Sequence, residues 1–205
     1  MIIDELRRAF FQIIIMIIIP FIWWVFWWFV TKNSKYSFFE WVGLKKPVIN
    51  NKKVFIVFIF LTFVIGFSMS LVLDPLLPDD IQLANERFGG QGIKVILPAI
   101  IFSFLATSLP EEIFFRGFLG KKLIRKTGFI IGNTIQSLIF GLLHGATMIP
   151  ALGIVIPLLV IFFTGLLGWF MGLINEKANG SILPSWCIHG ISNLYASIII
   201  MFNLL

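Results

Sequence analysis

The chain has 205 residues, of which 59% are hydrophobic and 13% are charged, and its mean hydropathy is +0.98. A water-soluble domain is only about 45–50% apolar, so the composition excludes that class and predicts an all-α, polytopic transmembrane helix bundle with the lipid bilayer as its surroundings. The net charge of +6 comes from cations that lie between apolar runs, and we expect no nucleic-acid partner. One cysteine, Cys187, excludes an internal disulfide.

Six apolar runs approach or exceed the length of about 20 residues that a transmembrane helix needs. They cover residues 10–30, 54–73, 95–109, 129–143, 154–174 and 182–204. The first is too long and too aromatic for a signal peptide, so we expect a retained span. The third and fourth are short, which predicts that these helices continue through polar residues at membrane depth. We divide the chain into residues 1–94, with two spans, an interfacial segment and a loop, and residues 95–205, a helix core.

The positions of the cations predict an orientation in the membrane. Of the 16 Lys and Arg residues, 12 lie in the first, third and fifth connections and 4 on the opposite side. This bias predicts that those connections are cytoplasmic and that both termini lie outside. In the first connection, residues 36–47 mix aromatic and lysine side chains, as either a short interfacial helix or an ordinary loop would. In the fifth span, Thr164, Gly168 and Gly172 form a small-residue stripe that predicts close helix packing.

The first cluster of charged residues beside an apolar run contains Glu111, Glu112 and Arg116. A charge at the centre of a membrane helix costs on the order of 2.5–3.5 kcal/mol, so each needs a reason to be there. Pro110 predicts a helix start or a kink, with the glutamates in the first turn. Glu112 and Arg116 are i and i+4 neighbours and should pair, whereas Glu111 has no local cation. Glu111 is therefore the candidate general base, and the alternative is a glutamate pair that only caps a helix.

Two further clusters contain both histidines of the chain. His144 lies near the end of the fourth span and shares a helical face with its other polar residues, so this face should contact protein rather than lipid. His189 and Asn193 are i and i+4 neighbours and present an imidazole and a carboxamide together. Either histidine alone is compatible with a buried structural role, but two on polar faces favour one shared site. Cys187 points to a different helix face from His189, which disfavours a cysteine nucleophile.

The depths of these residues are compatible with a single site near the middle of the membrane. Counted from the predicted cytoplasmic connections, Glu112, His144 and His189 lie roughly 14, 22 and 12 Å along their helices. His144 fits least well, and the fourth helix would have to be tilted or shortened for His144 to lie at the depth of the other two residues.

The three clusters resemble, in order, three motifs of the CPBP family, which comprises CAAX prenyl endopeptidases and the bacterial Abi or bacteriocin-processing proteins. Residues 111–116 resemble EExxxR, residues 140–144 resemble FxxxH, and residues 189–193 resemble HxxxN. Each motif alone is a weak signal, whereas the ordered set is specific. The resemblance implies an intramembrane endopeptidase that cleaves a peptide bond with an activated water.

The resemblance also implies roles for individual residues. Glu111 and His144 would activate the water, and His189 and Asn193 would stabilise the oxyanion. Members of the family have also been described as metalloproteases, which implies an alternative mechanism with zinc. Glu111, His144 and His189 would then be three zinc ligands, and water would be the fourth. Asparagine is an unusual zinc ligand, which favours the version without metal.

Glu112 with Arg116 would hold the first motif in place, and the substrate would be a peptide or membrane protein, with or without a lipid chain. We expect the protein to be a multi-pass protein of the cell membrane. Two other functions are compatible with the sequence. One is a non-catalytic immunity or scaffold protein of the same ancestry, and the other is a transporter that relays protons. The intact motifs disfavour the first, and the lack of a visible repeat disfavours the second.

Overall fold

The computed structural model describes residues 1–31, 36–78 and 84–204, and this part of the chain is 84% helical without a strand. The all-α prediction is confirmed. The long helices are α1 (Ile2–Thr31), α3 (Lys52–Leu73), α7 (Phe129–Ala146), α9 (Val155–Lys177) and α10 (Leu183–Met201). Short helices between them are α2 (Phe38–Val42), η1 (Asp74–Leu76), η2 (Glu86–Phe88) and α8 (Ile149–Leu152).

The third predicted span is much longer than its apolar run. Its consecutive helical segments are η3 (Gly92–Val95), α4 (Ile96–Ile100), η4 (Ile101–Ser108), α5 (Leu109–Glu111), η5 (Glu112–Gly120) and α6 (Lys121–Thr127). Two of them, η4 and η5, are π-helical, a wider turn that occurs frequently at functional sites. Pro110 therefore lies within a continuous helix, and Glu111 and Glu112 are not at a free helix start as the sequence suggested. Protein partners allow the helix to carry them at depth.

Five helical segments of the described chain are long and apolar enough to cross a membrane. They are Ile2–Thr31, Lys52–Leu76, Gly92–Thr127, Phe129–Ala146 and Val155–Lys177. The sixth predicted span is α10, whose 19 residues suffice in length but include polar residues such as Ser185 and His189 that lower its hydropathy. The chain is therefore a multi-pass membrane protein with roughly six spans.

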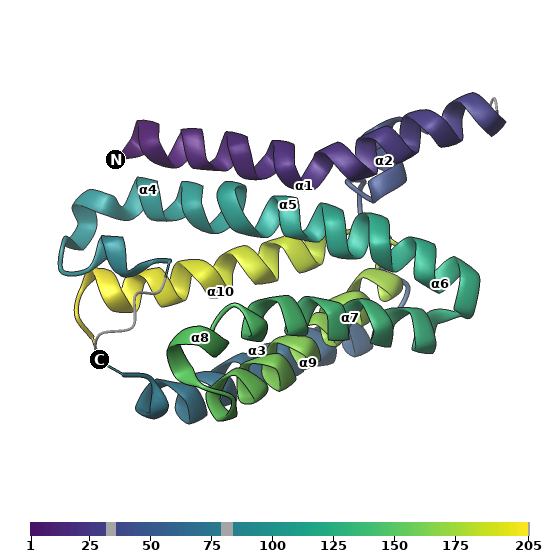
Figure 1. Ribbon diagram of the computed structural model, residues 1–205. Helices are drawn as coiled ribbons and strands as arrows, with labels where there is room; N and C mark the ends of the chain where they lie inside the picture. Colours follow the sequence, from purple (N-terminus) through teal and green to yellow (C-terminus); the bar gives the residue numbers. More distant parts are fainter. Residues whose placement is uncertain (32–35, 79–83, 205) are drawn as a thin grey trace.

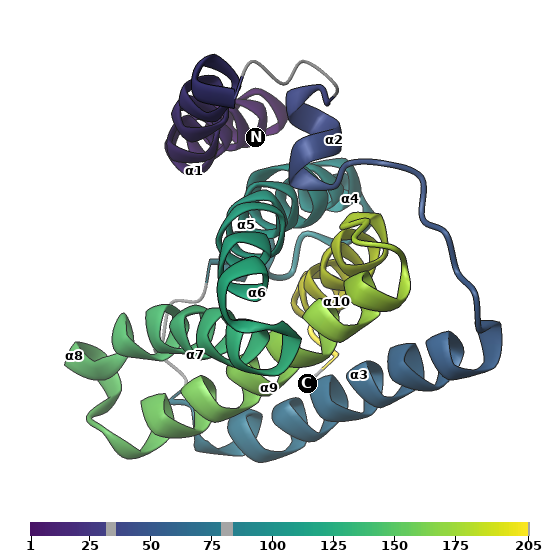
Figure 2. The same ribbon diagram turned by 90° about the vertical axis from the view of Figure 1, so that its right-hand side faces the viewer.

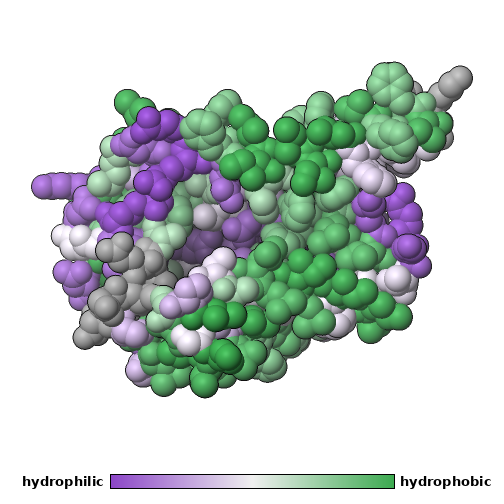
Figure 3. All heavy atoms as spheres, viewed as in Figure 1, coloured by the Kyte–Doolittle hydropathy of each residue, from purple (hydrophilic) through white to green (hydrophobic). Residues whose placement is uncertain are grey.

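The long helices run side by side, with both described ends of the chain at the same end of the bundle (Figure 1). Figure 2 shows the same ribbon turned by 90° about the vertical axis. In this view the α4–α6 run lies centrally beside α10, while α1 and α3 lie on opposite outer sides. On the face shown in Figure 3, a broad apolar region separates polar atoms at the two ends. The central run thus carries its polar residues among other helices rather than into lipid.

The first connection contains the short helix α2, which agrees with the helical alternative for residues 36–47. Ser37 and Glu40 form a capping box at its start, and Gly43, with φ of 97°, ends it. Two of the lysines counted for orientation, Lys32 and Lys35, lie outside the described residues.

Helices α7 and α9 approach each other closely through small residues. The predicted stripe of Thr164, Gly168 and Gly172 is buried in α9. A Cβ on Gly172 would lie within 2 Å of the side-chain oxygen of Asn133 on α7, so only glycine fits there without a shift. This contact positions α7, which carries one of the two histidines.

Replacing Gly141 by alanine should destabilise the bundle, because a Cβ there would lie 2.4 Å from the carbonyl oxygen of Ile161. Overpacking of this kind costs about 1–3 kcal/mol. Gly66→Ala is the matched control, since a Cβ on Gly66 of α3 has no neighbour within 4 Å. Thermal denaturation in lipid nanodiscs measures both variants, and equal midpoints would contradict the close packing of α7 on α9.

Candidate active site

Three side chains from separate helices meet inside the bundle. Glu111 comes from α5, His144 from α7 and His189 from α10. The Oε2 atom of Glu111 lies 3.8 Å from Nε2 of His144 and 3.8 Å from Nε2 of His189. This oxygen is buried and has no hydrogen-bond partner in the described part of the chain. The residues that the sequence placed at one depth are therefore in proximity, including His144, which fitted least well.

The partners of the two histidines indicate which ring nitrogen carries a proton. His144 Nδ1 lies 2.8 Å from the carbonyl oxygen of Phe140. A carbonyl only accepts, so Nδ1 donates, and Nε2 of a neutral ring is an acceptor on the side of Glu111. His189 Nδ1 lies 3.1 Å from Oε1 of Glu112 and donates to that carboxylate. The Nε2 atoms of both rings therefore border the space beside Glu111.

Glu112 is fully buried and contacts three other side chains. Its Oε1 lies 2.9 Å from Nη1 of Arg116 and 3.1 Å from Nδ1 of His189, and its Oε2 accepts a hydrogen bond of 2.5 Å from Ser185. The predicted i, i+4 ion pair between Glu112 and Arg116 is formed. The N–H bonds of Nη1 do not point at the carboxylate oxygen closely enough to make a hydrogen bond. Ser185 accepts in turn from Nδ2 of Asn175 at 2.7 Å. Glu112 therefore orients the imidazole of His189.

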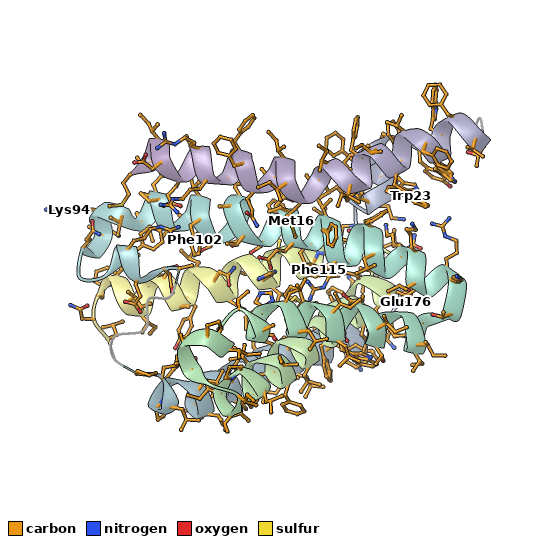
Figure 4. The ribbon with its side chains drawn as sticks, viewed as in Figure 1. Met16, Trp23, Lys94, Phe102, Phe115 and Glu176 are labelled. Atoms are coloured by element: carbon orange, nitrogen blue, oxygen red, sulfur yellow. The ribbon has the colours of Figure 1, made fainter. Side chains whose placement is uncertain are left out.

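The ring of Phe140 is shared by the cation and both imidazoles of the site. The guanidinium carbon of Arg116 lies 4.1 Å from the ring centroid. The centroids of the His144 and His189 rings lie at 4.3 and 6.2 Å. Phe115, labelled in Figure 4, packs edge-on at 5.0 Å. A desolvated cation–π contact contributes about 2 kcal/mol, so Phe140 helps to hold Arg116 inside the membrane.

Asn193 lies one turn after His189, but its carboxamide has other partners. Its Nδ2 lies 3.0 Å from Oγ1 of Thr107 and 3.4 Å from Oγ of Ser108. Both hydroxyls donate to carbonyl oxygens of η4 and so accept from Asn193. In this arrangement Asn193 joins α10 to η4. The resemblance implies that Asn193 donates to an oxyanion. For that contact, one N–H of its carboxamide must first break its hydrogen bond to the hydroxyl of Thr107 or Ser108.

The three proposed zinc ligands do not form a metal site in this arrangement. A tetrahedral zinc bound at about 2.0–2.1 Å requires ligand atoms about 3.4 Å apart, whereas the Glu111 oxygen lies 3.8 Å from each imidazole nitrogen. Among residues 1–31, 36–78 and 84–204, no group of three or more His, Cys, Asp or Glu side chains is arranged to hold a metal ion. No step proposed below passes through one.

Sequence reasoning missed the hydroxyl and amide groups that support the site. They are Thr107, Ser108, Asn175 and Ser185. Ser185 had a detectable signal, because it lies four residues before His189 and therefore on the same helical face. The other three lie on η4 and α9, and only tertiary contacts connect them to the site.

Ser185→Ala should lower the free energy of unfolding by about 1–3 kcal/mol, because it leaves a buried carboxylate oxygen of Glu112 without its hydrogen bond. Ser192→Ala on the same helix is the control, since Ser192 bonds only to the backbone of its own helix. Unfolding measured on both variants tests the prediction. If the two variants behave alike, Ser185 does not support Glu112.

Comparison with known families shows the family to which this chain belongs. The family model described as Type II CAAX prenyl endopeptidase Rce1-like matches residues 93–195, more than half of the chain. The chain belongs to this family. The matched segment includes Glu111, His144 and His189, and the resemblance inferred from the motifs is confirmed. At the level of the family, the Rce1-like assignment supports an intramembrane CAAX-type protease. No curated protein and no solved structure matches the chain.

Proposed function

We propose that the protein is an intramembrane endopeptidase in which Glu111 and His144 activate the hydrolytic water. One observation carries the proposal: the buried Oε2 of Glu111 has no hydrogen-bond partner among the residues that the structure describes and faces an imidazole nitrogen of His144 and of His189 at 3.8 Å each. A carboxylate with a free lone pair in a water-poor site is suited to remove a proton from water.

The reaction begins with a water beside Glu111 and His144. The water donates one hydrogen to Oε2 of Glu111 and the other to Nε2 of His144, whose second nitrogen is bonded to a carbonyl oxygen. Glu111 takes a proton as the water oxygen attacks the peptide carbonyl. It then gives this proton to the leaving nitrogen when the carbon–nitrogen bond breaks, so the carboxylate is regenerated.

The oxyanion formed in this attack needs donors in the same space. His189 donates through Nδ1 to Glu112, and with a second proton it donates through Nε2 to the oxyanion. Asn193 is the second proposed donor. It would exchange its hydrogen bond to Thr107 for one to the oxyanion. The Glu112–Arg116 pair positions His189 and is not expected to contact substrate.

The family and the position of the site support a proposal for the substrate class. The family's description names prenyl endopeptidases, and the site lies among spanning helices. We propose a membrane-associated peptide or membrane protein, with or without a prenyl chain, cleaved in the cell membrane.

Comparison of peptide termini in membranes that contain wild-type protein or Glu111→Ala tests this function. We expect at least one new terminus that appears only with the wild type, and we expect Glu86→Ala, at an exposed glutamate of η2, to retain it. Synthetic peptides of that sequence with and without a prenyl group then define the substrate. Identical termini in all three membranes would contradict the proposal and favour a non-catalytic role.

A further inference from the structure

A small cavity of about 40 Å³ is lined by Arg116, the partner of Glu112 in the buried ion pair. Six residues that line it are Arg116, Ile124, Gln136, Asn175, Glu176 and Ile182. The exposed Glu176, labelled in Figure 4, marks the polar end of the bundle at which the cavity lies. Neither Glu111 nor His144 lines it, so it is separate from the space proposed for the hydrolytic water.

Three of the lining residues carry buried polar atoms without a hydrogen-bond partner in the described chain. These atoms are the guanidinium nitrogens of Arg116, Oε1 of Gln136 and Oδ1 of Asn175. The amide orientations are fixed by their other ends. Nε2 of Gln136 donates to the side chain of Asn133 and to the carbonyl of Gly168, and Nδ2 of Asn175 donates to a serine hydroxyl. The two carbonyl oxygens therefore belong on the unpaired side.

The combination of these atoms restricts what can occupy the cavity. The positive charges of Arg116 and Lys121, which both line the cavity, disfavour a metal ion or another cation. The amide oxygens of Gln136 and Asn175, together with the lining carboxylate Glu176, disfavour an anion. A neutral molecule that both donates and accepts satisfies all three residues, and a volume of about 40 Å³ has room for roughly three to four waters at about 10–15 Å³ each.

We propose that this cavity binds a resident cluster of ordered water that completes the hydrogen bonding of Arg116. The cluster would contact both supports of Glu112, because Arg116 pairs with its Oε1 and Asn175 reaches its Oε2 through Ser185. It would therefore keep the buried cation hydrated from the polar end of the bundle while the catalytic side stays separate. This inference does not depend on the proposed peptidase activity.

Radiolytic hydroxyl-radical labelling of the full wild-type chain in nanodiscs tests the proposal, because radicals formed from trapped water oxidise side chains that solvent does not reach. Ile182 lines the cavity and is 1% exposed, whereas Ile174 is 0% exposed and does not line it. We expect oxidation of Ile182 and none above background at Ile174. Equal background values at both isoleucines would overturn the proposal.

A pair of variants on α6 and a high-resolution structure complete the test. Ile124→Phe should fill the cavity and abolish the labelling of Ile182, whereas Leu123→Phe, at a position that does not line the cavity, should preserve it. If Ile124→Phe does not fold, the comparison within the wild type still decides. Density for an ion or a lipid group in the cavity would also overturn the proposal, whether or not the protein cleaves peptides.

Discussion

Replacing Glu111 by glutamine should reduce peptide cleavage at least about 100-fold, the lower limit for loss of a general acid–base group. Glutamine keeps the size of the side chain but cannot take a proton from water. Because Oε2 of Glu111 has no hydrogen-bond partner in residues 1–31, 36–78 and 84–204, the substitution removes no bond described at that oxygen, and the variant should fold and accumulate as the wild type does. Cleavage of the peptide substrate by equal amounts of purified protein in nanodiscs measures the effect.

Glu86→Gln provides the matched control, because it makes the same chemical change at an exposed glutamate outside the site. It should retain full activity. His144→Ala should also lose activity, since the water would lose its second acceptor. Wild-type cleavage rates in both the Glu111→Gln and His144→Ala proteins would refute the mechanism even if the family assignment stands.

Replacing Arg116 by methionine should lower the free energy of unfolding by about 3–5 kcal/mol, the usual cost of removing one partner of a buried ion pair. Arg116 and Glu112 have side chains that are 2% and 0% exposed and lie 2.9 Å apart. Without the guanidinium, the Glu112 carboxylate remains inside the bundle without a compensating cation. Activity should fall as well, because Glu112 holds Nδ1 of His189. Unfolding by steric trapping in bicelles measures the loss of stability.

Two controls separate the ion pair from a general effect of losing a positive charge. Arg125→Met, at an exposed arginine of α6, should change stability by less than about 0.5 kcal/mol. The double variant Glu112→Gln, Arg116→Met should recover part of the lost stability, because no buried charge is left, but should remain inactive. A double variant less stable than Arg116→Met alone would show that Glu112 gains its stability from other partners.

The residues of the site were largely predictable from the sequence, because ionisable side chains are rare in apolar spans and each needs a reason. Glu111, His144 and His189 stood out for this reason, and the order of their motifs indicated the CAAX-protease family. The spacing of Glu112 and Arg116 predicted an ion pair that the structure contains. A helical spacing of four residues is a local property, and it therefore needs no tertiary information.

The sequence predicted that the third helix continues through polar residues at membrane depth, but it did not predict how far the helix extends. A sequence read by hydropathy ends that span near Pro110, whereas the helix continues to Thr127 and passes through two π-helical segments. The reason is that Glu112 and Arg116 have partners on other helices, which hydropathy does not include. The 19-residue helix α10 is also less apolar than a lipid-exposed span, because its polar side chains face these partners.

The amino-acid sequence by itself determined that the chain is a helical membrane protein and which residues are unusual at membrane depth. The tertiary structure decided that Oε2 of Glu111 lies near two imidazoles without a hydrogen bond in the described part of the chain, that Ser185 supports Glu112, and that Asn193 bonds to η4. These outcomes depend on which helices are neighbours. Because the rotation and depth of each helix are set by packing with other segments, no local pattern encodes them.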